Sequence, residues 1–194
     1  MNSKLITFTV MMAALGNVLS FIPIGLTQVG QVGFDLSHIA TFIAAIFGGP
    51  LVGCLVGFAG GVVAGIYFGP MGWLSWLGLI GIPIGKALTG LTTGAFFRLF
   101  KIDERTHCSS LTIPAVLTGY IPEFLFTVFF FLVLVPYFLG WLNLALLVSI
   151  AVKAWMEMVV MSVLMAALVG NMGFSVFIVN FLKLHKTDKM PYRN

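Results

Sequence analysis

Four ionisable residues lie inside long apolar stretches of the chain: Lys86, Glu123, Lys153 and Glu157. An ionised side chain is expensive in an apolar environment, and it needs a partner of opposite charge there. Residues of this kind are functional candidates by default when they occur in membrane-spanning segments. We therefore treat the four as the core of a candidate polar site.

Two interpretations of these charges are open. They could bind a substrate, or they could form buried ion pairs that hold helices together. Lysine four residues before glutamate is the poorer orientation for pairing within one helix, so we expect the cross-helix pairs Lys86 with Glu157 and Glu123 with Lys153. The four charges would then sum to zero, which favours a neutral or zwitterionic ligand over a polyanion.

The composition indicates that the chain lies mainly in a membrane. Of its 194 residues, 60% are hydrophobic and 8% are charged, whereas a soluble domain has about 25% charged residues. We predict an all-α membrane protein, a single domain with six transmembrane helices. The predicted spans are 4–25, 36–47, 51–68, 77–100, 111–138 and 142–169. Residues 170–194 form a basic tail, in which 174–184 either lies along the membrane surface or extends the last span.

The basic residues outside the spans set the orientation. They precede the first span, flank the loop after the fourth, and follow the sixth, while the loops near Gln28, Trp73 and Trp141 contain none. Lysine and arginine concentrate in cytoplasmic loops, so both termini are expected in the cytosol. The net charge of +4 therefore marks a membrane face, and no nucleic-acid partner is expected.

Three of the charged residues are expected at one depth. At a rise of about 1.5 Å per residue, Lys86 lies roughly 14 Å and Lys153 roughly 16 Å below the outer ends of their helices. Glu123 lies roughly 18 Å above the inner end of its own helix, in a hydrocarbon core of about 30 Å. Glu157 follows one turn deeper. The four can share one cavity just outside the midplane.

The outer loops supply further candidates for contacts with a ligand. Asp35 and His38 precede the second span, Trp73 and Trp76 precede the fourth, and Asn143 lies at the outer rim. Other readings are open, because tryptophan also anchors helices at the interface and Asp35 could cap a helix. His38 could have only a polar role at a helix end. Thr27, Gln28, Gln31, Met71 and Ser75 are further lid candidates, and the lesser candidates are Tyr120, Pro122 and Asn143.

Small residues recur at helical spacing in the third and fourth spans. Glycine occurs every four residues at 53, 57, 61 and 65, and the fourth span repeats the pattern at 81 and 85 and at 90 and 94. Such faces let neighbouring backbones approach closely, so we predict tight helix packing there. Between the second and third spans, Gly48-Gly49-Pro50 predicts a tight helical hairpin.

Catalytic motifs do not emerge from the sequence. The stretch from Gly81 to Lys86 lacks the spacing and the final Ser or Thr of a phosphate loop. Neither the zinc-protease motif His-Glu-x-x-His nor the serine-hydrolase motif Gly-x-Ser-x-Gly is present, and no cysteines have metal-site spacing. We expect no enzyme activity, no ATP hydrolysis by this chain, no metal and no cofactor.

The run from Asp35 to Gly53, DLSHIATFIAAIFGGPLVG, carries a family resemblance. It resembles the second-helix signature of the substrate-binding S components of energy-coupling factor (ECF) vitamin transporters: an acidic start, an apolar run, then Gly-Pro-x-x-Gly. The likeness extends to the six spans, the cytoplasmic termini, the glycine-rich third helix, the fourth helix ending in Arg98 and the lysine within the sixth.

The resemblance implies a function and partners. A member of this family binds a vitamin or a related small water-soluble micronutrient from outside, in the plasma membrane of a prokaryote. It works with a transmembrane scaffold (T) subunit and two ATPase (A) subunits. In the family, the first helix meets the scaffold through Ala-x-x-x-Ala, and the nearest matches here are Thr9 with Ala13 and Gly16 with Ser20.

Two other functions fit the same residues. One is a self-sufficient secondary transporter in which Glu123 or Glu157 carries a proton. Such carriers usually consist of repeated halves with broken helices, and no convincing repeat is found in this sequence. The other is a non-transporting membrane assembly or enzyme subunit, in which the charges are purely structural.

Overall fold

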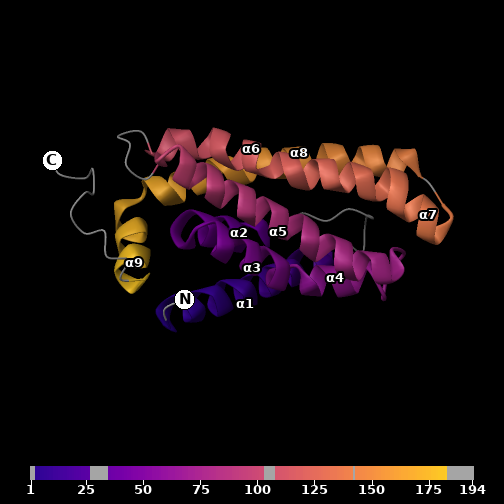
Figure 1. Cartoon of the computed structure of the whole chain (residues 1–194), viewed down its shortest axis with the longest axis horizontal. Coiled ribbons are helices and arrows are strands. Elements are labelled where there is room, and N and C mark those ends of the chain that lie inside the picture. The colour runs from indigo at the N-terminus through magenta and orange to yellow at the C-terminus, as the bar shows by residue number, and fades with distance from the viewer. Residues whose placement is uncertain (1–2, 27–34, 103–107, 142, 183–194) are drawn as a thin grey trace.

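The computed structural model describes residues 3–26, 35–102, 108–141 and 143–182, and every regular element in these ranges is a helix (Figure 1). The predicted all-α fold is confirmed. The elements are α1 (Ser3–Leu26), α2 (His38–Ile43), the π-helix η2 (Ala44–Gly48), α3 (Pro50–Gly60), α4 (Val62–Phe68), α5 (Ser75–Leu99), α6 (Cys108–Phe129), the π-helix η4 (Phe130–Leu134), α7 (Val135–Leu139), α8 (Leu144–Gly170) and α9 (Met172–Leu182).

Within the described residues, five helical stretches are long and apolar enough to cross a membrane. They are Ser3–Ile22, Pro50–Phe68, Ser75–Leu99, Ser109–Leu139 and Leu144–Gly170. The remaining predicted span corresponds to the shorter apolar stretch His38–Gly48. A helix needs about 20 residues to cross the hydrocarbon core, so this stretch reaches only part of the way. Ser37, directly before this stretch, is buried inside the bundle.

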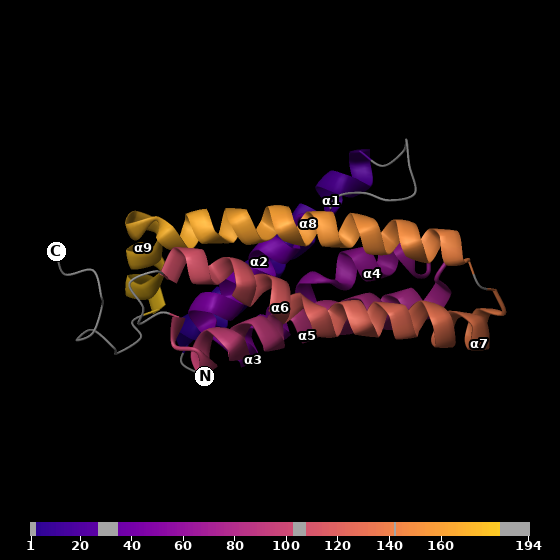
Figure 2. The same cartoon turned by 90° about the horizontal axis from the view of Figure 1, so that it is seen from above.

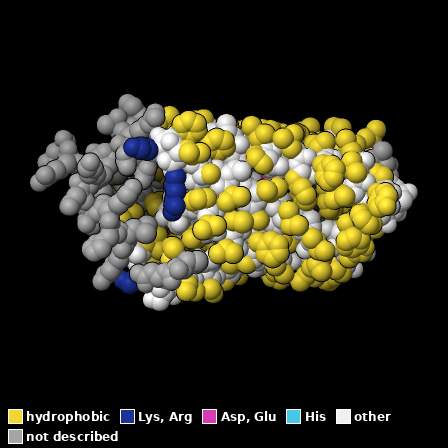
Figure 3. All heavy atoms as spheres, in the orientation of Figure 1, with side chains coloured by type: hydrophobic (Ala, Val, Ile, Leu, Met, Phe, Trp, Pro, Cys, Tyr) yellow, Lys and Arg dark blue, Asp and Glu magenta, His cyan; other side chains and the backbone are white. Residues whose placement is uncertain are grey.

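The surface suits lipid tails. Apolar side chains cover most of the face seen in Figure 3, and the lysine and arginine side chains visible there gather at one end of the bundle. The α1 helix exposes large apolar residues along its length, including Val10, Met11, Val18 and Phe21. Exposed apolar area on this scale indicates a lipid or protein environment rather than water. The chain is a multi-pass membrane protein.

Helices α5, α6 and α8 run lengthwise beside one another, as Figures 1 and 2 show, and α3 packs along α5. The contact between α3 and α5 depends on the predicted glycines. A β-carbon on Gly53 or Gly57 would overlap the backbone of α5 at Gly90 and Lys86 respectively. The prediction of close packing from the four-residue spacing is confirmed at these positions. The approach fixes the backbone of Lys86 against α3.

Substituting Gly90 with alanine should disrupt this packing. The added β-carbon would overlap the carbonyl group of Gly53, which cannot move without displacing α3. We expect the free energy of unfolding to fall by about 1–3 kcal/mol, the usual cost of overpacking. Thermal unfolding of the purified protein in detergent measures the change. Gly60→Ala is the matched control, because its nearest atom would be 3.5 Å from the new β-carbon. Equal stability of both variants would contradict the prediction.

A polar contact closes the break between α3 and α4. Gly61 separates the two helices, and Asn17 of α1 lies beside the gap. The side-chain amide of Asn17 donates to the carbonyl oxygen of Ala59 at 2.9 Å, and its oxygen accepts from the backbone nitrogen of Val63 at 3.0 Å. Backbone groups in a bilayer must be satisfied within the protein. Asn17 therefore provides hydrogen-bond partners for the backbone groups of Ala59 and Val63 at the break, and it links α1 to this point.

The hairpin between η2 and α3 has the predicted tight form. Gly49 has φ +91°, a conformation that side chains with a β-carbon rarely adopt. Pro50 opens α3, where its missing N–H is not needed. Arg98 near the end of α5 donates from Nη2 to the carbonyl oxygen of Gly48 at 3.3 Å. This contact satisfies a carbonyl at the end of η2 and links the hairpin to α5.

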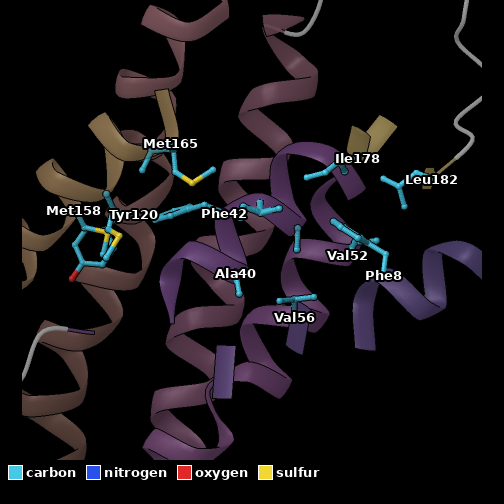
Figure 4. Close-up of a cluster of buried hydrophobic side chains, with 14 residues drawn as sticks. Phe8, Ala40, Phe42, Val52, Val56, Tyr120, Met158, Met165, Ile178 and Leu182 are labelled. Atoms are coloured by element: carbon cyan, nitrogen blue, oxygen red, sulfur yellow. The ribbon is translucent and has the colours of Figure 1, made fainter. Parts of the chain in front are cut away.

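The last helix turns away from the one before it. Asn171 ends α8 and caps α9, because its side-chain oxygen accepts from the backbone nitrogen of Phe174 at 3.0 Å. In Figure 1, α9 lies across the end of the bundle rather than along it. Its Ile178 and Leu182 are buried with Phe8 of α1 in the main core (Figure 4). The segment after α8 thus does not extend the last span.

Candidate functional site

Lys86 is fully enclosed in the bundle and has an acidic partner. Its residue exposure is 2%, and Nζ lies 2.7 Å from Oδ2 of Asp35. It also donates to Oγ of Ser37. The other carboxylate oxygen of Asp35 accepts from Oγ of Ser37 at 2.6 Å and from the Ser37 backbone nitrogen at 3.0 Å. Asp35 is therefore the ionic partner of a buried lysine, although 23% of its own side chain is exposed.

The second ion pair lies within α8. Nζ of Lys153 is 2.9 Å from Oε1 of Glu157, whose side chain is 3% exposed. The same oxygen accepts a hydrogen bond from the backbone nitrogen of Asp35. Glu157 thus joins α8 to the segment that leads into α2. Lys153 is more accessible, with 25% of its side chain exposed.

These contacts correct the predicted pairing. Lys86 does not pair with Glu157, and Glu123 does not pair with Lys153. The orientation of lysine before glutamate within one helix is the poorer one, but it contributes only a few tenths of a kcal/mol. A buried backbone N–H that needs an acceptor outweighs that preference. Glu157 pairs with Lys153 of its own helix, and the same carboxylate oxygen accepts from the backbone nitrogen of Asp35.

Glu123 of α6 is the third carboxylate in the cluster, and its contacts are not with lysine. Oε2 accepts from the hydroxyl of Thr89, one turn after Lys86 on α5. Oε1 lies 3.7 Å from Nε2 of His38, at the start of α2. In the described part of the chain, no lysine or arginine is within ion-pair distance of Glu123.

His38 is buried beside this carboxylate. The residue is 4% exposed, and its ring stacks on Phe42 at 5.9 Å and meets Tyr120 edge-on at 6.4 Å between centroids. Nδ1 has no hydrogen-bond partner among the described residues. A buried polar atom without a partner is uncommon and calls for an explanation.

An aromatic wall flanks the charged groups. Trp155 of α8 lies between Lys153 and Glu157 in sequence and contacts Tyr120 at 5.6 Å and Phe124 at 5.5 Å between ring centroids. Figure 4 places Tyr120 next to Met158 at the edge of the core. The sequence analysis ranked Tyr120 as a lesser candidate and overlooked Trp155. A signal existed for Thr89, which follows Lys86 by three residues on a helix.

The structure gives the rim candidates other contacts. Trp73 packs on Phe131 and on Trp141, at 5.9 and 5.4 Å between ring centroids, and Trp76 packs on Phe138 at 5.2 Å. Asn143 caps α8, with its side-chain oxygen accepting from the Leu146 backbone nitrogen at 3.0 Å. None of these contacts joins the ionic cluster. Thr27, Gln28 and Gln31 lie outside the described residues.

The predicted docking residues on α1 have contacts within the chain. Gly16 and Ser20 are buried, and a β-carbon on Gly16 would lie 3.3 Å from Cα of Gly60 on α3. Ala13 is half-buried, and its carbonyl group faces Gly60 of α3. Thr9 is also half-buried, and its hydroxyl donates to the Leu5 carbonyl. Small residues pack helix against helix, and here α3 takes that contact. The two small-residue pairs therefore do not form one outward surface.

The cluster has the kinds of group that can recognise a small ligand. Asp35, Lys86, Glu123, Lys153 and Glu157 come from α5, α6, α8 and the segment before α2, and they meet inside an apolar bundle. Among the described residues, no group of His, Cys, Asp or Glu side chains is arranged to hold a metal ion. Charged and aromatic groups of this kind fix a small ligand by ion pairs, hydrogen bonds and ring contacts.

Comparison with known proteins identifies the family of the chain. A model of the family described as the substrate-specific component of ECF transporters matches residues 4–169, which is most of the chain. No curated protein and no solved structure matches it. The match covers every element that contributes to the ionic cluster. The chain belongs to the ECF transporter substrate-specific component family, the transport proteins that its second-helix signature resembles.

Proposed function

We propose that this chain captures a small water-soluble vitamin or related micronutrient from outside the cell and binds it at the ionic cluster. Family membership supports the role of a substrate-binding subunit. In this proposal, a scaffold subunit and two ATPase subunits supply the energy for uptake into a prokaryotic cell. The chain itself binds and releases the substrate.

The observation that carries the proposal is the depth and variety of the buried polar groups. Charged residues inside a membrane protein are expensive and usually belong to a substrate or ion pathway. Here, Lys86, Glu123 and Glu157 lie on three different helices and are brought to one place. An ion pair that only holds the fold together needs no more than two helices. A cluster that joins α5, α6, α8 and the start of α2 is suited to hold a ligand among them.

Native mass spectrometry of the purified chain tests the binding step. We expect a small molecule of vitamin size to co-purify with the wild type and to be lost in Lys153→Met, because this lysine is the more accessible of the two in the cluster. Ser149→Ala is the matched control, since Ser149 is exposed on the same helix and its hydroxyl only donates to the Ala145 carbonyl. The control should retain the molecule.

Uptake into vesicles distinguishes the transport mechanism. With partner ATPases and scaffold co-reconstituted, uptake of the co-purifying compound should require ATP. Uptake by the chain alone, driven by a proton gradient, would instead support the secondary carrier. A wild type that is empty and binds no member of a vitamin panel at micromolar concentration would overturn the proposed function and favour a structural role.

A further inference from the structure

The ionic cluster contains more carboxylates than ammonium groups. Two lysines and two glutamates were expected in the cluster from the sequence, but Asp35 joins them in the structure. Three carboxylates, from Asp35, Glu123 and Glu157, therefore face the two ammonium groups of Lys86 and Lys153. One carboxylate, that of Glu123, has no lysine or arginine partner among the described residues. An excess charge inside an apolar bundle is unfavourable unless something compensates for it.

The uncompensated charge belongs to Glu123. Lys86 is held by Asp35 at 2.7 Å and Lys153 by Glu157 at 2.9 Å, so both ammonium groups are already engaged. The contacts of Glu123 are the neutral hydroxyl of Thr89 and the ring of His38, whose Nε2 is 3.7 Å away. That distance is too long for a good hydrogen bond. The carboxylate can therefore accept a further strong donor.

His38 has a ring nitrogen without a hydrogen-bond partner next to Glu123. Nδ1 of His38 and Oγ1 of Thr93 are the two buried side-chain polar atoms that find no hydrogen-bond partner within the described residues. In a neutral imidazole that keeps its proton on Nε2, facing Glu123, Nδ1 is an acceptor. Leaving a buried acceptor unpaired is unfavourable. An N–H donor from a ligand would provide the missing partner.

The aromatic neighbours suit a cation. Tyr120 meets both His38 and Trp155 edge-on, and Phe124 packs on Trp155. The faces of tyrosine and tryptophan rings attract positively charged groups, more strongly where water is excluded. An anion would find the opposite conditions here, with three carboxylates and no ammonium group free of a partner among these residues.

We propose that the compound bound at this site carries a protonated nitrogen with at least two N–H donors, as in an amidine or a basic amino-heterocycle. One N–H group pairs with the carboxylate of Glu123, and another donates to Nδ1 of His38. This inference rests on the proposed function, because it assigns the chemical class of the substrate that the ionic cluster takes.

Three probes of the same shape and different charge test it. Benzamidine is cationic at pH 7.5, benzamide is neutral and benzoate is anionic. Isothermal titration calorimetry of the full chain in nanodiscs should give benzamidine at least tenfold tighter binding than either of the others. Glu123→Gln, which keeps an acceptor for Thr89, should abolish the advantage, and the control Ser149→Ala should retain it.

The outcomes separate this inference from the proposed function. Benzoate or benzamide binding as tightly as benzamidine overturns the inference, and so does a wild type that does not bind benzamidine. A co-purifying compound without a basic nitrogen also overturns it, but that compound still supports the proposed function. The wild-type probe series needs no variant, so the test stands even if Glu123→Gln fails to fold.

Discussion

Lys86→Met is expected to lower the free energy of unfolding by about 3–5 kcal/mol, because it leaves the mostly buried carboxylate of Asp35 without its cation. Methionine has nearly the length of lysine, so the loss of packing is small. The cost comes from the charge. Lys86 is 2% exposed and contacts both Asp35 and Ser37, so solvent cannot replace it.

A double-mutant cycle separates charge from packing. Asp35→Asn together with Lys86→Met removes both charges, and the pair should recover most of the stability lost in Lys86→Met alone. Tryptophan fluorescence follows unfolding in detergent micelles, since Trp155 contacts Tyr120 beside the cluster. Leu91→Met on the exposed side of α5 is the control and should change stability by less than about 0.5 kcal/mol. A double variant as unstable as the single one would show that Lys86 acts through its packing.

Local periodicity explains which parts of the fold the sequence predicted well. The glycine spacing placed Gly53 and Gly57 on one helix face, and the structure packs that face against α5. The predicted depths of Lys86 and Lys153 in the membrane rest only on the rise of a helix and the position of its ends, and they stay predictions. Such features depend on residues close together in the chain, and one sequence contains them all.

The choice of ionic partners depends on geometry that a single sequence does not contain. The stretch formed by α2 and η2 is too short to cross the bilayer. Asp35, which lies just before this stretch, therefore reaches Lys86 of α5 and pairs with it. The sequence analysis placed Asp35 in an outer loop instead. The rotation of α1 about its own axis was likewise not predicted, and in the structure Gly16 faces α3. Both depend on contacts between distant segments.

Glu157→Ala is expected to weaken binding of the compound that co-purifies with the wild type by about a hundredfold, within the usual range for truncating one partner of a buried charged pair. Glu157 accepts from the backbone of Asp35 and pairs with Lys153, so alanine frees both groups at once. The segment before α2 then loses its attachment to α8. Asp35 and His38, which that segment positions, are no longer held around the ligand.

Comparison of two substitutions at this position identifies which property of Glu157 matters. Glu157→Gln keeps an oxygen that accepts from the Asp35 backbone but removes the charge that pairs with Lys153. If attachment of the segment dominates, Gln should lose much less affinity than Ala, as measured by titration of the co-purifying compound into nanodiscs. Val159→Ala, on the exposed side of α8, should bind like the wild type. Equal losses in Gln and Ala would mean that the charge of Glu157, and not its hold on Asp35, keeps the site assembled, because the backbone hydrogen bond would then survive without preserving affinity.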